Sequence, residues 1–363
     1  MGIFEQMEKY GHEQVIFCQH KATSLKSIIA IHDTTAGPAL GGCRMRPYDN
    51  EEEMLFDVLR LSRGMTYKCA IADVDNGGGK CVIWGDPASD KTGEMFRALG
   101  RFVDGLGGRF YTGTDVGTYP TDFVQAKRET PYIVGVPLEY GGSGDSSIPT
   151  AFGVLEGIRA TAMKLWGSTS LKGKIFAVQG LGKVGAKVAK SLADEGAILM
   201  VTDVVQANID RFFDVVPDAA VVSPDSIFSL ACDMLIPCAL GAVLNDRTIP
   251  ELRCKAIVGS ANNQLLDEEK HGTMLKDRGI LYAPDYLVNA GGLIQVADEL
   301  HGANPERVLS KTNAIYDILL QVYELAEARN IPTSIAANQL VEERLNRIAD
   351  IKRIRGSATR SVT

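Results

Sequence analysis

Lys174-Ile-Phe-Ala-Val-Gln179 runs directly into Gly180-Leu-Gly-Lys-Val-Gly185, and this stretch decides the fold of the chain. Its first half is a short apolar run that predicts a β-strand, and Ala186–Glu195 after the glycines predicts a helix. A second strand is expected at Ala197–Thr202, which closes on Asp203. A GxGxxG turn between a strand and a helix, with an acid about twenty residues further on, is typical of a dinucleotide-binding unit.

The glycines of this turn have separate physical roles. The first permits the tight turn, the second lets the backbone approach a pyrophosphate, and the third lets the helix pack on the sheet. The phosphates are expected at the helix N-terminus, where backbone amides have no partner within the helix. The residues assigned to this phosphate loop are Gly180, Gly182, Lys183, Val184 and Gly185.

The acid at the end of the second strand predicts the type of dinucleotide. Asp203 is expected to accept hydrogen bonds from the adenosine ribose hydroxyls. Val204, Val205 and Gln206 follow it, and none of them is an arginine that would hold a 2′-phosphate. The pattern therefore favours NAD over NADP.

Further short strands extend the same doubly wound sheet. They are predicted at Met234–Ile236, Ala256–Gly259 and Leu281–Tyr282, and each leads into small or polar residues. Ligands meet the carboxyl ends of the strands in such sheets. Cys238 and Ala239, which follow the first of these strands, are accordingly assigned to the cofactor site.

The first third of the chain alternates apolar segments with turns and predicts a separate α/β domain. A Gly- and Ser-rich joint at Tyr140–Ser147 precedes a helix at Ala151–Leu165, and the end of the chain, Asn304–Arg355, reads as helical with a loose tail. We therefore predict one domain from residues 1–134 with 331–363, and a Rossmann domain from residues 135–330. In the first domain, strands are expected at Gln14–Cys18, Ser27–His32, Cys81–Trp84 and Arg109–Thr112, and helices at Glu51–Arg63 and Glu94–Leu106.

Two lysines around a glycine-rich segment are the clearest chemical feature of this first domain. Lys68 lies upstream of Gly77-Gly78-Gly79, which Lys80 follows. The glycines suggest a backbone that approaches a ligand closely. Neighbouring ammonium groups would also suit one lysine to bind a carboxylate and the other to take part in proton transfer. The alternative is a pair of exposed lysines on either side of a strand.

Composition excludes several other classes of function. The 363 residues are 45% hydrophobic and 23% charged with a formal charge of −7, which fits a globular protein of two domains and argues against nucleic acid or an anionic membrane as a partner. The polar N-terminus is no signal peptide, and no apolar run reaches the ~18 residues of a membrane span. Seven scattered cysteines predict reduced, mostly buried thiols in a cytoplasmic protein, and five dispersed histidines predict no metal site.

Several motifs occur in an order that resembles the amino-acid dehydrogenases related to glutamate dehydrogenase, and within them the leucine/phenylalanine branch. The resemblance covers nearly the whole chain. It implies reversible NAD-linked oxidative deamination, in which an amino acid becomes a 2-oxo acid and ammonia is released. The motifs are Gly11–Phe17, Thr35–Arg44, Arg63–Lys68, Gly77–Lys80, Thr112–Asp115, Ser260–Gln264 and Pro284–Glu299.

The resemblance assigns a role to each reacting group. Lys68 would hold the substrate carboxylate, and Lys80 would polarise the attacking water and the carbinolamine oxygen. Asp115 would carry protons to and from the amine. These roles agree with the chemistry, because a developing oxyanion requires a cation and an amine requires a nearby carboxylate. The alternative for Asp115 is a helix cap after the Gly113-Thr114 turn.

Further residues of the site follow from the same resemblance. The backbone at Leu40-Gly41 and the amide of Asn262 would fix the substrate, and Thr150 and Asn289 would position the nicotinamide. The alternatives are that Thr150 belongs only to a helix start and that both asparagines are turn formers.

The side-chain pocket implied by the resemblance predicts the substrate. Leucine-preferring relatives usually have Ala and Val where this chain has Gly113 and Leu293, whereas phenylalanine-preferring relatives have Gly and Leu. The missing methyl at Gly113 would admit the edge of a ring, so L-phenylalanine is the expected substrate, with phenylpyruvate and ammonia as products; leucine is the alternative. The lining residues are Leu40, Met65, Gly113, Val134 and Leu293.

Two further expectations concern the whole protein. The family implies a homo-oligomer, and closure of a cleft between the two domains would bring the nicotinamide to the substrate Cα. The alternative from a different class is a catalytically inactive NAD-binding regulator. Retention of Lys68, Lys80 and Asp115 together argues against that alternative, because an inactive relative has no need of all three.

Overall fold

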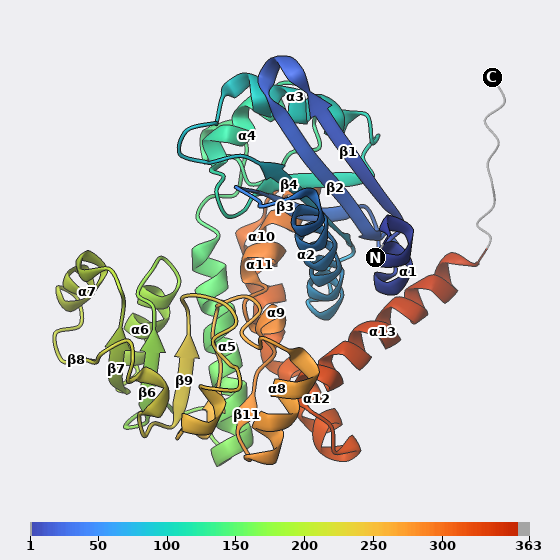
Figure 1. The fold of residues 1–363 in the computed structure, drawn as a ribbon. Coiled ribbons are helices and arrows are strands. Elements are labelled where there is room, and N and C mark those ends of the chain that lie inside the picture. The colour runs from blue at the N-terminus through green and yellow to red at the C-terminus, as the bar shows by residue number, and fades with distance from the viewer. Residues whose placement is uncertain (1, 355–363) are drawn as a thin grey trace. The chain divides into compact units, whose positions relative to one another are not determined.

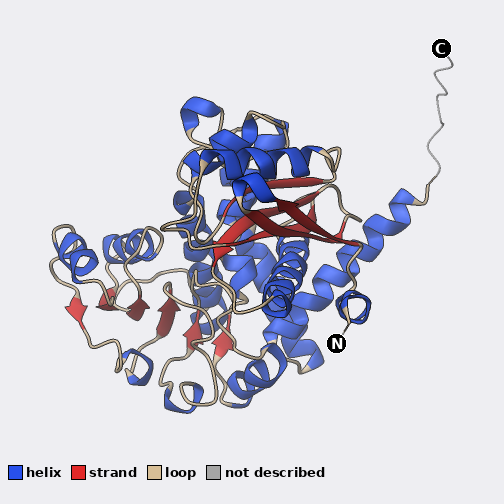
Figure 2. Cartoon of the chain, turned by 45° about the horizontal axis from the view of Figure 1, so that its top comes forward, coloured by secondary structure: helices blue, strands red, loops and turns tan. Residues whose placement is uncertain are grey.

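The computed structural model describes residues 2–354, which form two compact α/β units (Figure 1). The first unit contains the described residues up to Gly144 and those from Gln339 onward, and the second contains Asp145–Asn338. The boundary at Gly144 lies in the glycine-rich joint at 140–147, after the predicted boundary at 134, and the return to the first unit comes at Gln339 and not at 331. The predicted loose tail at Gly356–Thr363 lies outside the described residues. Figure 2 shows the strands of each sheet in red with helices packed along them.

A five-stranded mixed sheet forms the centre of the first unit, in the order β1-β2-β4-β3-β5. Strands β1–β2 and β2–β4 pair antiparallel, whereas β3–β4 and β3–β5 pair parallel. The sequence predicted four of these strands but missed β3, whose Gly41-Gly42 pair weakens the strand pattern. The strands are β1 (Gln14–His20), β2 (Leu25–Asp33), β3 (Ala39–Arg46), β4 (Gly77–Trp84) and β5 (Phe110–Thr114).

Helices cover both faces of this sheet. Helix α2 packs on one face through a cluster that includes Leu55, Leu59 and Val82, and α3 and α4 cover the other face around Phe96 and Phe123. Asn50 caps α2 by accepting a hydrogen bond from the Glu53 amide at 2.9 Å. The helices are α1 (Ile3–Tyr10), α2 (Glu51–Ile71), α3 (Gly93–Asp104) and α4 (Pro120–Lys127), with α13 (Thr333–Lys352) at the chain end.

Helix α2 is longer than the sequence predicted, and this changes where the site residues lie. It was expected to end at Arg63 but continues to Ile71, so Met65 and Lys68 lie on a helix. Gly64 costs about 1 kcal/mol in a helix interior. Packing of the following turn against β4 offsets that cost, since Thr66 is buried.

The glycines of β4 bring this helix close to the sheet. A Cβ on Gly78 would lie 2.1 Å from the amide and the hydroxyl of Thr66, and a Cβ on Gly79 would lie 2.7 Å from the Phe110 ring. Such contacts are too close for any side chain. The expectation that these glycines open the backbone toward a ligand is therefore wrong, because they accommodate neighbouring protein atoms instead.

The second unit contains a six-stranded parallel sheet in the order β11-β10-β9-β6-β7-β8. Numbered along the chain, this is the 3-2-1-4-5-6 order of dinucleotide-binding sheets. The predicted doubly wound sheet is confirmed. Its strands are β6 (Ile175–Gln179), β7 (Ile198–Thr202), β8 (Ala220–Val221), β9 (Met234–Pro237), β10 (Ala256–Ile257) and β11 (Leu281–Tyr282).

Helices flank this sheet, and a buried core that includes Leu235, Ile257 and Leu275 fills the space between them. The helical end of the chain, predicted as one stretch, is divided into three helices. Asn330, which adopts a left-handed backbone (φ 52°), ends the second of them. The helices are α5 (Ser147–Trp166), α6 (Gly185–Asp194), α7 (Gln206–Phe213), α8 (Glu268–Asp277), α9 (Asp285–Val288), α10 (Gly291–Asp298), α11 (Pro305–Asn313), α12 (Ile315–Arg329) and α13.

Three structural observations concern the membrane segments, metal sites and cysteines that the sequence analysis considered. No helix in residues 2–354 is long and apolar enough to cross a membrane. Within the same residues, no three His, Cys, Asp or Glu side chains are arranged to hold a metal ion. The seven cysteines are free and mostly buried, as predicted, and burial raises the pKa of the Cys69 thiol to about 12.

Two buried histidines make the first unit sensitive to acid. His12 Nε2 lies 2.8 Å from Ser62 Oγ, and the His12 and His32 rings are 4.8 Å apart between centroids. Burial lowers the pKa of His12 from 6.5 to about 4, and burial also lowers the pKa of His32. Between pH 6.5 and about 4, the unfolded chain binds a proton at His12 that the folded chain does not bind. Stability therefore falls as the pH drops from 6.5 to about 4.

We expect this effect to be measurable in urea unfolding. His12 alone should remove about 2 kcal/mol of unfolding free energy between pH 7 and pH 5. The variant His12→Asn should show a weaker dependence on pH over this range. The control is His20→Asn, since His20 is exposed and its ring Nδ1 lies 3.0 Å from the Thr23 hydroxyl at the surface. An identical pH dependence in wild type and His12→Asn would contradict the prediction.

Candidate active site

An ion pair between buried Lys80 and half-buried Asp115 lies at the centre of the first unit's site. Lys80 comes from the middle of β4 and Asp115 directly follows β5. The register explains their meeting, because Cys43 of β3 pairs with Cys81 on one side and with Thr114 on the other. Lys80 is only 6% exposed. A lysine so buried requires a charged partner.

The surroundings of Asp115 keep its carboxylate ionised. Burial alone would raise its pKa, but the charges of Lys80 and Arg44 outweigh burial and lower it. The Val116 amide also donates a hydrogen bond to Oδ1 at 2.6 Å. The helix-cap alternative is wrong, since α4 begins at Pro120 with Tyr119 in the N-cap position.

The strand and helix that flank this pair supply an apolar wall and a second lysine. Leu40 of β3 is buried. Met65 of α2 lies against the β3 backbone, since a Cβ on Gly41 would be 3.2 Å from Met65 Cγ. Lys68 is half-buried one helical turn after Met65, so both side chains leave the same side of α2.

Gly113 and Val134 meet through their backbones. The Val134 amide donates to the Thr112 carbonyl at 3.0 Å, which places the segment around Val134 beside β5. A Cβ on Gly113 would lie 2.5 Å from the Val134 carbonyl oxygen. The physical reason for glycine here is this close approach of two backbones. The expectation that the missing methyl leaves room for a ring edge is thereby corrected, because a methyl at Gly113 would press on Val134 first.

The phosphate loop of the second unit has the geometry that its three glycines predict. Gly180 has a left-handed backbone (φ 96°), and a Cβ there would lie 2.9 Å from Ala239 Cβ. A Cβ on Gly185 would lie 2.0 Å from the Gly180 carbonyl oxygen and 3.0 Å from Cys238 Cβ. Gly182 differs, since its Cβ would meet nothing within 4 Å. The open side of Gly182 fits the approach of a pyrophosphate.

The remaining loop residues lie where α6 begins. Val184 is the N-cap residue of α6, and Lys183 is exposed beside it. The carbonyl of Gly182 accepts a hydrogen bond from the Ala186 amide at 3.1 Å. Cys238 and Ala239 follow β9, which neighbours β6 at the point where the strand order reverses.

Asp203 directly follows β7 and is hydrogen-bonded to this loop. Its Oδ2 accepts hydrogen bonds from the Leu181 amide at 2.7 Å and from Asn208 Nδ2 at 3.1 Å. Its Oδ1 accepts one from the Val205 amide at 2.8 Å. Burial would raise the pKa of Asp203, but these donors lower it overall, so the carboxylate is ionised at neutral pH.

The two predicted asparagines form one hydrogen-bonded unit. Asn289 is buried, and its Nδ2 donates to Asn262 Oδ1 at 2.7 Å and to the Ser260 carbonyl at 3.1 Å. Asn289 Oδ1 is buried and accepts no hydrogen bond from the described residues. A buried acceptor of this kind fits a donor group of a bound ligand, such as a carboxamide.

Thr150 and Leu293 belong to the same part of the second unit. Thr150 lies in the first turn of α5, and its Oγ1 donates to the Ser146 carbonyl at 2.8 Å. A Cβ on Gly292 would lie 2.8 Å from that hydroxyl. Leu293 is 9% exposed and lies one turn beyond Asn289, on α10. The structure thus brings Thr150 beside the helix start that follows Asn289.

Sequence reasoning assigned no role to three acidic or basic residues that support these groups. Arg44 contacts Asp115, and Asp57 contacts Arg44. In the second unit, Asp285 Oδ2 accepts hydrogen bonds from the Gln264 amide at 2.7 Å and from the Tyr282 hydroxyl at 3.1 Å, which fixes the loop that contains Asn262. Asp57 could have been found from the sequence, because it occurs among the apolar positions of a helix, where a charged side chain requires a partner.

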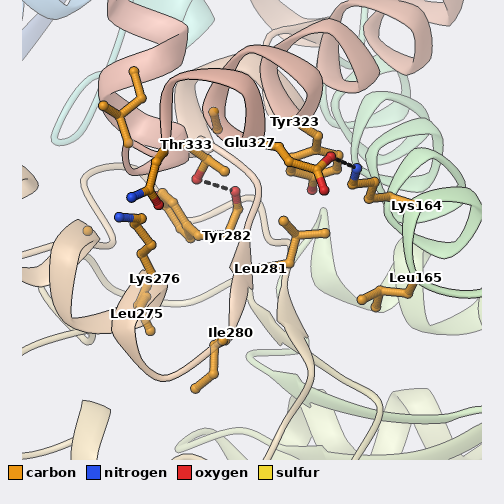
Figure 3. A pocket seen from close by; sticks show the side chains of 15 residues that line it. Lys164, Leu165, Leu275, Lys276, Ile280, Leu281, Tyr282, Tyr323, Glu327 and Thr333 are labelled. Atoms are coloured by element: carbon orange, nitrogen blue, oxygen red, sulfur yellow. Dashed lines mark hydrogen bonds and ion pairs between the residues drawn. The ribbon is translucent and has the colours of Figure 1, made fainter.

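A pocket of about 360 Å³ elsewhere in the second unit is lined by none of the residues assigned to substrate or cofactor. It lies between α5, α8, β11 and α12, where Lys164 and Glu327 form an ion pair at 2.6 Å (Figure 3). Thr333 Oγ1 donates to the Tyr282 carbonyl at 2.7 Å along one wall. The pocket is therefore separate from the dinucleotide loop and from the Lys80–Asp115 pair.

The sheet order and the glycine loop define a dinucleotide-binding enzyme, and comparison with known proteins gives its family. The family model described as "Glu/Leu/Phe/Val dehydrogenase, dimerisation domain" matches residues 12–132, and the model "Glutamate/Leucine/Phenylalanine/Valine dehydrogenase" matches residues 198–348. The chain belongs to this family of amino-acid dehydrogenases. Membership and the sheet together imply a nicotinamide cofactor.

Individual relatives are similar over almost their full length. The chain is 58% identical to a phenylalanine dehydrogenase of Thermoactinomyces intermedius, over 97% of this chain and 96% of the relative. It is 52% identical to a leucine dehydrogenase of the same organism, over 95% and 94%. Among solved structures, L-tryptophan dehydrogenase from Nostoc punctiforme superimposes with a TM-score of 0.85 at 45% identity, covering 96% of this chain and 99% of that one.

Proposed function

We propose that this chain catalyses the reversible, NAD-dependent oxidative deamination of L-phenylalanine to phenylpyruvate and ammonia. The observation that carries the proposal is the ion pair of buried Lys80 with Asp115 beside the apolar Leu40 and Met65. The higher identity to phenylalanine dehydrogenases than to leucine dehydrogenases supports phenylalanine as the substrate. The first unit would bind the amino acid and the second unit the dinucleotide.

The residues of the first unit would share the chemistry. Lys68 binds the substrate carboxylate, while ionised Asp115 accepts a proton from the substrate ammonium. A bound nicotinamide cofactor would supply the hydride acceptor for Cα, which leaves an iminium on the substrate. Water then adds to the imine carbon, and Lys80 stabilises the oxygen of the carbinolamine. Asp115 returns its proton to the amine, ammonia departs as the C=O bond forms, and the two protons of the added water pass to solvent, which leaves the 2-oxo acid.

The residues of the second unit would hold the cofactor. Gly182 and the amides at the start of α6 face the pyrophosphate, and Asp203 accepts hydrogen bonds from the adenosine ribose. Val204 is 87% exposed beside Asp203, and Leu240 is 76% exposed after Ala239, which supports an apolar contact with the adenine ring. Buried Asn289 Oδ1 would accept a hydrogen bond from the nicotinamide carboxamide.

The assignment of NAD rests on Asp203 and has a direct test. Asp203→Ala should weaken NAD binding by about 1–3 kcal/mol, because a hydrogen-bonded charge is lost and the Leu181 amide loses its acceptor. Activity with NADP should rise relative to NAD, since the carboxylate that repels a 2′-phosphate is gone. The measurement is kcat/KM for both cofactors. A wild type that prefers NADP would contradict the assignment.

A homo-oligomer is proposed on the basis of the first unit. The model that matches residues 12–132 is described as a dimerisation domain. Strand β1 is an edge of the five-stranded sheet, and Phe17 on it is 52% exposed. An exposed edge of this kind can pair with a second copy. Phe17→Asp should lower the mass measured by sedimentation velocity, and a wild type that sediments as a single chain would contradict the proposal.

Two alternative functions are separated by a single assay. NADH formation is followed by absorbance with phenylalanine, leucine, tyrosine and tryptophan as substrates. The highest kcat/KM with phenylalanine is the expected result. The highest value with leucine would favour the leucine alternative, which the 52% identical relative keeps open. No turnover with any amino acid would favour a non-catalytic NAD-binding regulator.

A further inference from the structure

Arg44 of β3 is anchored by a buried carboxylate on α2. Its Nη1 donates to Asp57 Oδ1 at 3.2 Å and to Asp57 Oδ2 at 3.1 Å. Asp57 is 5% exposed and also accepts a hydrogen bond from the Tyr48 hydroxyl at 3.0 Å. A guanidinium held in this way by a carboxylate has little freedom to turn.

The other side of the same guanidinium faces Asp115. Arg44 Nε lies 3.9 Å from Asp115 Oδ2, which is also the oxygen that Lys80 contacts. The Nε–H is buried and donates no hydrogen bond to the described residues. A buried donor without an acceptor is costly, so a small approach of the Asp115 carboxylate to Nε is favourable.

The backbone of Asp115 is held by the same strand. Its amide donates to Thr118 Oγ1 at 2.9 Å, and that hydroxyl donates to the Cys43 carbonyl at 2.9 Å. A Cβ on Gly42 would lie 3.0 Å from Asp115 Cβ, so β3 also fills the space next to this residue. Strand β3 therefore positions both the backbone and the side chain of Asp115.

We propose that Arg44 is a positioning residue that holds the Asp115 carboxylate in place when Lys80 leaves it for the substrate oxygen. The inference rests on the proposed function, in which Lys80 and Asp115 act on different atoms of the substrate. In the structure described here, these two residues contact each other. Once Lys80 turns away, Arg44 is the remaining cation in contact with Asp115. Its Nε–H then donates a hydrogen bond to Asp115 Oδ2, the oxygen that Lys80 has left.

The charges around this arrangement predict which substitutions have an effect. Lys80 on β4 and Arg44 on β3 contact Asp115 directly. Asp57 contacts Arg44 and also lies 3.9 Å from Arg60 and 3.8 Å from Arg46. Arg60 is half-exposed, and its ion pair within the described residues is with Asp57 Oδ1. Loss of Arg44 should therefore affect catalysis, whereas loss of Arg60 should not.

The test compares steady-state kinetics of Arg44→Ala and Arg60→Ala with phenylalanine and NAD. Arg44→Ala should lower kcat by about 10²-fold, the scale expected when a reacting group is misplaced, with little change in KM for NAD. Guanidinium at concentrations below those that unfold the protein should restore part of the lost kcat. Urea has the same shape without the charge and should restore none. Arg60→Ala should have the kcat of the wild type and should not respond to guanidinium.

Other outcomes overturn the inference. One such outcome is a kcat of Arg44→Ala equal to that of the wild type. Another is equal restoration of kcat by urea and guanidinium, because it would show that the added molecule fills space and that its charge has no effect. If circular dichroism shows that Arg44→Ala is unfolded, Arg44→Lys replaces it, because lysine keeps the charge but cannot reach Asp57 and Asp115 together. Arg44→Lys should then lower kcat with an unchanged KM for NAD, and a wild-type kcat would overturn the inference. A wild type without phenylalanine-dependent NADH formation would overturn the proposed function as well.

Discussion

Lys80→Ala is expected to lower kcat by roughly 10²–10³-fold or more, the usual effect of removing a group that stabilises a developing oxyanion. The substitution removes the cation proposed to act on the carbinolamine oxygen. It also leaves the half-buried carboxylate of Asp115 with Arg44 as its remaining charged contact among the described residues. Binding of NADH should stay close to that of the wild type, because Lys80 belongs to the first unit and the dinucleotide loop to the second. The measurements are kcat with phenylalanine and a fluorescence titration with NADH.

A matched control separates loss of chemistry from loss of an ion pair. Lys91 pairs with Asp122 at 2.9 Å in the same unit, and both side chains are less than one-fifth exposed. Lys91→Ala should reduce stability without a large change in kcat. A Lys80→Ala protein that keeps one-tenth of the wild-type kcat would end the catalytic assignment of Lys80.

Substitution of Gly113 by Ala together with Leu293 by Val should move the preference from phenylalanine toward leucine. A change of about one methylene in an apolar pocket is worth about 1–3 kcal/mol, so Leu293→Val should shift the ratio of kcat/KM values roughly 10–200-fold. Neither substitution touches a charged group, so NAD affinity should remain near that of the wild type. The measurement is kcat/KM for both amino acids, and an unchanged ratio would contradict the proposed pocket.

The structure predicts that the two single substitutions act differently. Leu293→Val shortens a nearly buried side chain on α10 and should change the ratio on its own. Gly113→Ala places a methyl 2.5 Å from the Val134 carbonyl oxygen, so β5 or its neighbour must move. It should therefore lower kcat/KM for both amino acids and alter the ratio through this movement. Leu319→Val, in the buried core of α12, is the control and should lower stability without changing the ratio.

The dinucleotide unit could be predicted from the sequence almost completely. Its information is local: a strand, a glycine turn, a helix and an acid follow one another in a short stretch from Lys174 to Asp203. The backbone requirements at Gly180 and Gly185 are so strict that few residues other than glycine are compatible with them. Alternation of strands and helices then favoured the parallel sheet that the structure contains.

The first unit was harder to predict, because its decisive contacts are not local. Strand β3 contains two glycines and has no strong strand pattern, yet it lies between β4 and β5 and determines where Lys80 and Asp115 meet. Helix α2 continues through Gly64 because packing on β4, and not helix propensity, decides its length. Neither effect can be read from neighbouring residues in the chain.

The sequence by itself determined the family motifs, the glycine loop, the doubly wound sheet and the choice of Lys68, Lys80 and Asp115 as the proposed reacting side chains, because each depends on residue type and spacing within a short segment. Only the tertiary structure decided what lies next to each of these groups. In the tertiary structure Lys80 pairs with Asp115, and Arg44 and Asp57 lie next to this pair. The backbone of Gly113 lies against the Val134 carbonyl oxygen. The physical reason is that burial and charge pairing depend on which strands are neighbours, and strand pairing joins residues that are far apart in the sequence.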